Sequence, residues 1–327
     1  MRSTSVFSSV VRSSILLAVG LLGLAAAPLA CSGASTGSGF DGDGGTGGLG
    51  DGSSGGTLGG DGSSGGGSGS DGCSDAAKLV YVVDSKNGLH SFDPATLKFT
   101  VIGTLNCPTK GGILKDPTPN SMAVDRSGTA WVNFGDGELF KVSTADASCT
   151  ATSYAPSSKT SEQRWGMAFS SNTAGSSDET LFAVPNDGSS SGSGVSSLNM
   201  SSLKLTTIGD FTDGLSGDSA ELTGTGDGNL FAFVTTTPAT LAKVDKTSGA
   251  TAKADQVKLT GVDTGTAFAF SFWGGDFWLY TSSDQISSQV TQYKASGDKS
   301  ISVVVDDTGF AIVGAGVSTC APTAPPR

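Results

Sequence analysis

The chain has 327 residues and a formal net charge of −11, with 30 acidic residues against 19 basic ones. This charge argues against nucleic acid and anionic membrane surfaces as partners, because both require a basic face. The single histidine, His90, excludes a zinc site built from two histidines of one chain, and a Ser-His-Asp triad would have to use this one residue.

The first thirty residues have the pattern of an export signal. Arg2 and Arg12 carry positive charge without any acid, and an apolar run at 15–27 follows them. The run is shorter than the ~18 residues that span a bilayer. Small residues then lead to Cys31, so we expect residues 1–30 to be a lipoprotein signal peptide and Cys31 to carry the lipid. Pro28 stands where lipoprotein signals have Leu, and secretion without a lipid is the alternative.

Residues 31–72 are expected to be a disordered tether of Gly, Ser and Asp. The tract 32–72 contains 20 glycines and only three large apolar residues, so it cannot bury enough surface to offset the entropy of ordering. A Gly/Ser coil of ~40 residues reaches roughly 35 Å. An acidic spacer is favoured over a calcium-binding β-roll, because Gly and Ser follow the regularly spaced Asp residues.

Five repeats make up the folded domain, which we expect at residues 73–321, followed by a short tail at 322–327. A short strand of the form apolar-x-x-apolar-polar recurs with a period of 46 to 56 residues, at 89–93, 139–143, 195–199, 241–245 and 290–294. A second strand precedes each of them, at 78–83, 130–134, 181–184, 230–233 and 277–280, and an earlier one recurs at 122–124, 167–169, 222–224 and 268–270. Four short strands per ~50 residues, with Gly, Asp and Asn at the turns, are typical of a propeller blade.

The first repeat lacks its earliest strand, and the end of the chain supplies one at 310–312. The sequence therefore predicts an all-β fold, a five-bladed β-propeller in which the C-terminal strand joins the N-terminal blade. Such a closure covers the edge that an open ring would expose.

Three segments of this domain carry a resemblance. ELTGTGDG at 221–228, FWGGDFW at 272–278 and IVGAGVSTCAP at 312–322 resemble the lipoprotein-type β-propeller proteins of Gram-negative bacteria with large genomes. The resemblance implies the same fold and export to the envelope, and it implies no activity.

Four cysteines remain when Cys31 is set aside, an even number that indicates two disulfides in an exported chain. Cys73 and Cys320 flank neighbouring strands of the same blade, so their pairing would fasten the ring. Cys107 and Cys149 then pair by elimination, although regular strands would place them on opposite faces, so that the segment 107–120 would have to bend back. A zinc site from the four thiols is the alternative, without the C-x-x-C spacing that favours it.

The longer loops fall on one face of the predicted propeller, at 103–120, 155–164, 185–194 and 209–220. Binding usually resides in long loops on a rigid scaffold, so we expect the ligand site at the channel mouth on this face. Glu221 would supply charge, Arg164 would orient it, Trp165 would form an apolar wall, and Asn120 would complete the site. In the simpler interpretation Arg164 and Glu221 only form a salt bridge with each other.

These observations favour a tethered binding or interaction module over an enzyme, with no cofactor and no metal. We expect a monomer whose partner is an envelope protein or a small ligand, and which touches the membrane only through its N-terminal lipid. Its location would be the outer membrane or cell surface, or else the periplasm or the medium. The alternatives are a metal-dependent, lactonase-like hydrolase using Glu221, Asn120 and Asp125, and a purely structural envelope protein.

Overall fold

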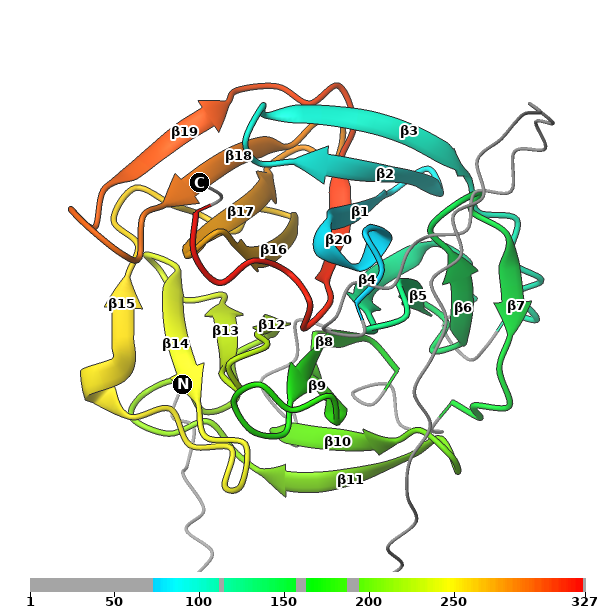
Figure 1. Cartoon of the computed structure of the whole chain (residues 1–327), viewed down its shortest axis with the longest axis horizontal. Coiled ribbons are helices and arrows are strands. Elements are labelled where there is room, and N and C mark those ends of the chain that lie inside the picture. The colour runs from blue at the N-terminus through cyan, green and yellow to red at the C-terminus, as the bar shows by residue number, and fades with distance from the viewer. Residues whose placement is uncertain (1–72, 112–114, 157–162, 187–193, 326–327) are drawn as a thin grey trace, which may run out of the picture. The chain divides into compact units, whose positions relative to one another are not determined.

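The computed structural model describes residues 73–111, 115–156, 163–186 and 194–325. The expected signal peptide, the tether with Cys31 and the last two residues of the tail lie outside the described residues. Within them, twenty strands form five four-stranded antiparallel sheets arranged in a ring (Figure 1). The prediction of an all-β, five-bladed propeller is confirmed.

Each blade is an antiparallel meander whose strands follow one another from the channel to the rim. The first blade, from the channel outwards, is β20 (Ile312–Val317), β1 (Val80–Asp84), β2 (Gly88–Asp93) and β3 (Lys98–Thr104). The second is β4 (Pro119–Val124), β5 (Thr129–Phe134), β6 (Leu139–Ser143) and β7 (Cys149–Ala151). The third is β8 (Trp165–Ser171), β9 (Glu179–Pro185), β10 (Val195–Asn199) and β11 (Lys204–Gly209). The fourth is β12 (Ala220–Gly224), β13 (Leu230–Val234), β14 (Thr240–Val244) and β15 (Gln256–Lys258). The fifth is β16 (Ala267–Trp273), β17 (Asp276–Ser282), β18 (Gln289–Tyr293) and β19 (Ile301–Val305). Two 3₁₀ turns, Ala76–Lys78 and Lys253–Asp255, are the described helical segments.

The ring closes between the two ends of the domain. Strand β20 pairs with β1, with Val317 opposite Val80 and Ala315 opposite Val82. Closure by a C-terminal strand is confirmed, but the strand is Ile312–Val317 rather than the expected 310–312. Phe310 instead stacks on the ring of His90, outside the sheet.

Close packing at the channel explains why the closing strand was misplaced. A Cβ on Gly314 would lie 2.9 Å from the backbone of Ser121, so β20 needs glycine where it passes β4. Gly166 of β8 is under the same constraint, because a Cβ there would lie 2.1 Å from the carbonyl oxygen of Ala220 in β12. The strand therefore lacks the run of large apolar residues by which strands are recognised.

Apolar side chains fill the spaces between neighbouring blades. One cluster joins Val83 and Leu89 of the first blade to Met122 and Val132 of the second, all fully buried. Burying each such side chain stabilises the fold by about 1.5–3 kcal/mol. Side-chain packing therefore fills the spaces between blades, and hydrogen bonds from blade to blade, such as those from Ser121 to Glu221 and from Phe272 to Thr223, add to it.

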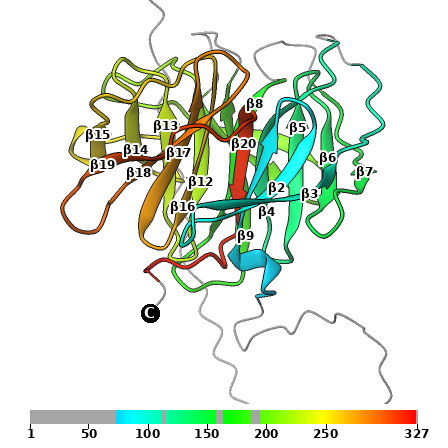
Figure 2. The same cartoon turned by 90° about the horizontal axis from the view of Figure 1, so that it is seen from above.

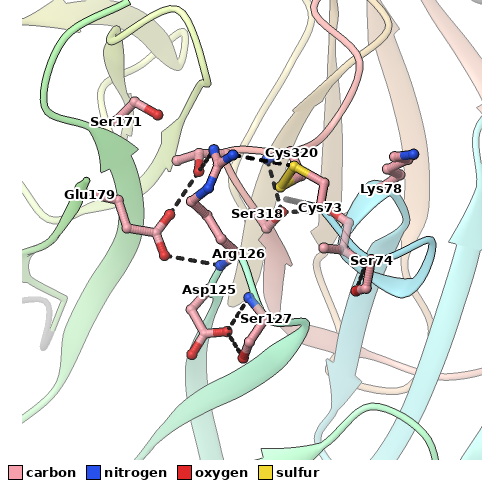
Figure 3. Close-up of a disulfide and its surroundings, with 12 residues drawn as sticks. Cys73, Ser74, Lys78, Asp125, Arg126, Ser127, Ser171, Glu179, Ser318 and Cys320 are labelled. Carbon is pink, nitrogen blue, oxygen red and sulfur yellow. Dashed lines mark hydrogen bonds between the residues drawn. A yellow bond between two sulfur atoms is a disulfide. The ribbon is translucent and has the colours of Figure 1, made fainter. Parts of the chain in front are cut away.

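A disulfide fastens the ring at the end of the closing strand (Figure 3). Cys73 and Cys320 are joined, with their Cα atoms 5.8 Å apart. Beside them, Arg126 donates to Cys73 Sγ at 3.4 Å and to Thr319 Oγ1 at 3.1 Å, and Thr319 donates to Glu179 at 2.7 Å. The pairing expected from the sequence is the one present in the structure.

The second disulfide joins Cys107 to Cys149, with a Cα–Cα distance of 5.0 Å. Strands in a sheet rotate by about 20–25° from one to the next, so the outermost strand of a blade turns away from the ring axis. Figure 2 shows β20 upright and β3 running across it. The end of β3 therefore reaches the β6–β7 turn of the next blade, where a Cβ on Gly103 would lie 3.0 Å from that of Ala147. The expected separation onto opposite faces was wrong because it treated the blades as flat.

Candidate functional site

A cavity of about 460 Å³ lies where the innermost strands of all five blades begin. Each blade contributes at least one lining residue, and these include Val313, Asn120, Asn186, Thr235 and Ala267. The volume falls in the range of small-molecule sites, which runs from about 300 to 1,000 Å³. The cavity is the mouth of the propeller channel.

The cavity lies on the face that carries the long loops. Asp116, Arg164 and Ser219 line it from three of the links between blades, and Asn186 lines it from the β9–β10 loop. Parts of three of these loops, 112–114, 157–162 and 187–193, lie outside the described residues.

Asn120 lines the cavity and is held by a buried amide. Its side-chain nitrogen donates to Asn133 Oδ1 at 3.3 Å and to the carbonyl oxygen of Trp165 at 3.0 Å. Asn133 is fully buried, and its Oδ1 also accepts the backbone N–H of Trp165 at 3.0 Å. The two amides thereby connect the second blade to the start of the third.

Arg164 lines the cavity, but it does not pair with Glu221. Its Nη2 lies 2.5 Å from Asp116 Oδ2, and its Nε donates to the carbonyl oxygen of Gly135 at 3.3 Å. Both side chains of this pair are about one third exposed, so solvent weakens the interaction. The expectation that Arg164 orients or neutralises Glu221 was wrong, because Asp116 on the preceding link lies nearer.

Trp165 forms no wall of the cavity. Its side chain is 2% exposed and packs edge-to-face on Tyr154, with ring centroids 4.9 Å apart, in the core between the second and third blades. Its backbone takes part in the site instead, because its carbonyl accepts from Asn120 and its N–H donates to Asn133 Oδ1. As the first residue of β8, its side chain follows the alternation of the strand into the space between blades. Phe268 is the aromatic residue that lines the cavity.

Glu221 lies buried beneath the cavity, on β12. Its Oε2 accepts the hydroxyl of Ser121 at 2.7 Å, and its Oε1 accepts the amide of Asn186 at 2.5 Å. Burial raises the pKa of Glu221 well above its usual range, although the hydrogen bonds from Ser121 and Asn186 act in the opposite direction. The carboxyl therefore connects three blades at the floor of the mouth rather than offering a charge to a ligand.

The structure thus brings Asn120 and Arg164 to one cavity, places Glu221 under it and keeps the ring of Trp165 outside it. Sequence reasoning missed Asn186 and Asp116. Asn186 lies in the predicted loop 185–194, and Asp116 lies in a long link, so both stood at loop positions without a distinguishing pattern.

The oxygen ligands of the hydrolase alternative do not converge. Asp125 follows the last residue of β4, whereas Asn120 is near its first residue, and five residues of strand span roughly 16 Å. Asp125 Oδ1 accepts from the backbone of Ser127 and Thr129 at the turn on the other face. Among the residues that the structure describes, no group of three His, Cys, Asp or Glu side chains is arranged to hold a metal ion.

His90 is a packing residue. It is buried, its Nε2 lies 2.8 Å from Asp84 Oδ2, and its ring stacks on Phe310 with centroids 4.1 Å apart. Asp84 also accepts the backbone N–H groups of Lys86 and Gly88, which ties it to the β1–β2 turn. The pair stabilises the first blade, and neither of its two residues lines the cavity.

Comparisons with known proteins add no family. No family model matches the chain, and no curated protein matches it. Among solved structures, a protein of unknown function from Bacteroides caccae is 15% identical, with 70% of this chain and 73% of that chain covered and a TM-score of 0.38. A chain of a nidogen/laminin complex is 13% identical, with 73% and 80% covered and a TM-score of 0.41. The Dos1 propeller is 12% identical, with 70% and 56% covered and a TM-score of 0.39. At these scores the similarities carry no argument about function, and the strand order alone defines the fold.

Proposed function

We propose that this chain is an exported binding module, anchored through a lipid on Cys31, whose ligand sits in the cavity at the channel mouth. The observation that carries the proposal is the cavity itself, a recess of about 460 Å³ framed by all five blades. Small-molecule sites are concave and contain a small number of precisely placed polar groups that orient the ligand.

The floor of this cavity is preorganised. Asn120 and Asn186 line it, and both amides are held by buried acceptors, Asn133 and Glu221. Side chains that are already ordered lose little entropy when a ligand binds, which favours affinity. The arrangement therefore supports recognition more than a chemical step.

The two disulfides support export, because such bonds persist in oxidising compartments. No described segment is a helix long and apolar enough to cross a bilayer. A lipid on Cys31 and a spacer at 32–72 would hold the propeller near a membrane while leaving its channel mouth accessible.

The binding function is tested by filling the cavity. Thr266 lines it and is exposed, so Thr266→Trp would occupy the mouth without entering the core. The matched control is Thr100→Trp, at an exposed position on the rim strand β3. The full chain and both variants are screened against a library of small polar compounds by thermal shift.

We expect compounds that raise the Tm of the parent and of Thr100→Trp, and not that of Thr266→Trp. Hits that stabilise all three proteins equally would refute the cavity as the site. No hit with the parent chain would favour the structural envelope protein.

The anchor is tested separately. Mass spectrometry of the mature N-terminus should show acyl chains on Cys31. The Cys31→Ala variant should no longer be found in the membrane fraction. A Cys31→Ala chain that still partitions with membranes would contradict the anchor without affecting the cavity.

A further inference from the structure

Five polar side chains that line the channel mouth are held by hydrogen bonds that leave an oxygen able to accept. They turn their N–H or O–H groups into the protein. The oxygen lone pairs of these side chains are left to accept hydrogen bonds from a ligand in the cavity. The side chains that share this property are Asn120, Asn186, Thr118, Thr235 and Thr266.

The orientation of Asn120 follows from its surroundings. Its nitrogen faces two oxygens, Asn133 Oδ1 and the carbonyl of Trp165, and neither can donate. Asn133 is itself fixed, because its own nitrogen donates to the carbonyl of Gln163 at 3.0 Å and its Oδ1 accepts from a backbone N–H. The amide of Asn120 therefore has one orientation, in which its oxygen is left for the cavity it lines.

Asn186 is oriented by Glu221. One N–H of Asn186 donates to Oε1 of the buried carboxyl, while Ser121 occupies Oε2. Oε1 serves as an acceptor whether the carboxyl is ionised or carries its proton on Oε2. The oxygen of Asn186 is again left for the cavity, so Glu221 acts as a positioning residue.

Three threonine hydroxyls behave in the same way. Thr118 donates to Asp116 at 2.5 Å, Thr235 donates to the carbonyl of Ser219 at 3.1 Å, and Thr266 donates to the carbonyl of Ser282 at 3.2 Å. A hydroxyl has one proton, so each of these oxygens can only accept from a ligand.

The charges of the lining cancel, since Asp116 and Arg164 pair at 2.5 Å and the other lining residues are neutral. An anion would be disfavoured because it would lie against oxygen acceptors. A cation would be disfavoured because the one carboxylate among the described lining residues is already paired with Arg164. Phe268 and Pro119 add apolar surface, against which the C–H face of a ring can pack.

We propose that this cavity selects neutral ligands with several hydroxyl groups, that is sugars, because five of its lining side chains hold oxygens that accept hydrogen bonds and the charges of its lining cancel. The inference rests on the proposed binding function and specifies its ligand class. Each ligand hydroxyl would donate to an oxygen whose own proton, or whose amide N–H, is already directed inward.

The decisive test compares sugars with their fully O-methylated forms, which keep the ring and the oxygens and lose every donor. The full chain is titrated with a panel of mono- and disaccharides, and with the methylated form of each, by calorimetry. A hydrogen bond contributes about 0.5–1.5 kcal/mol, or about 2- to 12-fold in Kd, so losing three or more should weaken binding at least about 10-fold.

Equal binding of the free and methylated sugars would overturn the inference, and so would the absence of any binding by the free sugars. If amines or carboxylates instead bind in a way that Thr266→Trp abolishes, the binding function stands and the sugar assignment fails.

A second test addresses the role of Glu221. Glu221→Met removes the acceptor that orients Asn186, whereas Glu221→Gln retains an acceptor oxygen. We expect Glu221→Met to weaken sugar binding about 10-fold and to reduce the discrimination against methylated sugars, with most of both restored in Glu221→Gln. Unchanged discrimination in a folded Glu221→Met protein would refute the positioning role.

The threonine oxygens are tested by Thr235→Val, which removes one acceptor, with Thr100→Val on the rim strand as the matched control. A loss of about 2- to 12-fold in affinity is expected for the first and none for the second. Equal affinities in both variants would exclude Thr235 from the site and contradict the acceptor lining.

Discussion

Removing the disulfide between Cys73 and Cys320 should destabilise the propeller more than removing the one between Cys107 and Cys149. The first bond joins residues 247 positions apart, and the second joins residues 42 apart. A cross-link restricts the unfolded chain, and the restriction grows with the length of the loop it closes. On the chain-entropy relation the two bonds contribute about 5.5 and about 4 kcal/mol.

The loss for the ring-closing bond should fall below this ceiling, at about 3–5 kcal/mol. Strand β20 stays paired with β1 along five positions when the bond is absent, and Thr319 still donates to Glu179. Even so, the loss would be a large part of the 5–15 kcal/mol that typically separates the folded and unfolded states of a domain.

The assay is equilibrium unfolding in guanidinium chloride, with the double variants Cys73→Ala/Cys320→Ala and Cys107→Ala/Cys149→Ala beside the parent chain. We expect the free energy of unfolding to fall further in the first variant. The reasoning is refuted if the pair with the short loop proves equally or more costly to remove. It is also refuted if the ring-closing pair costs less than 1 kcal/mol, since closure would then depend on strand pairing alone.

Two further predictions concern the channel. The pKa of Glu221 is higher in the folded state than in the unfolded state, so the folded state binds this proton more tightly. The resulting stabilisation is complete below about pH 4.3, and it is lost as the pH rises through the folded pKa. Denaturation midpoints measured across that window should decline in the parent relative to Glu221→Gln, and parallel curves would contradict the assignment. Gly166→Ala should lower the free energy of unfolding by about 1–3 kcal/mol, because the new Cβ would overlap the backbone of β12. The control Gly309→Ala should lower it by only about 1 kcal/mol, because Gly309 has a φ of 79° but no atom of the described residues near the position of the new Cβ. Equal losses in these two variants would show that the innermost strands do not pack as tightly as described.

Several features of the fold follow from local sequence. Blade number came from a repeated strand pattern, and ring closure came from the strand missing in the first repeat and present at the chain end. The bond between Cys73 and Cys320 followed from the same topology. These features could be predicted because side-chain alternation and turn residues are encoded within a few neighbouring positions.

The candidate site depended on tertiary structure. The sequence placed Arg164 and Glu221 near one channel, but only the folded chain shows that Asp116 is the partner of Arg164 and that Ser121 and Asn186 are those of Glu221. These partners lie in other parts of the ring, up to a hundred residues away in the sequence. A local sequence pattern does not indicate contacts between residues so far apart. The twist of each blade explains how Cys107 reaches Cys149, a pairing that was expected only by elimination. The sequence alone therefore determined the architecture of the propeller. The side-chain contacts at the channel mouth depend on how one blade packs against the next, and this packing exists only in the closed ring.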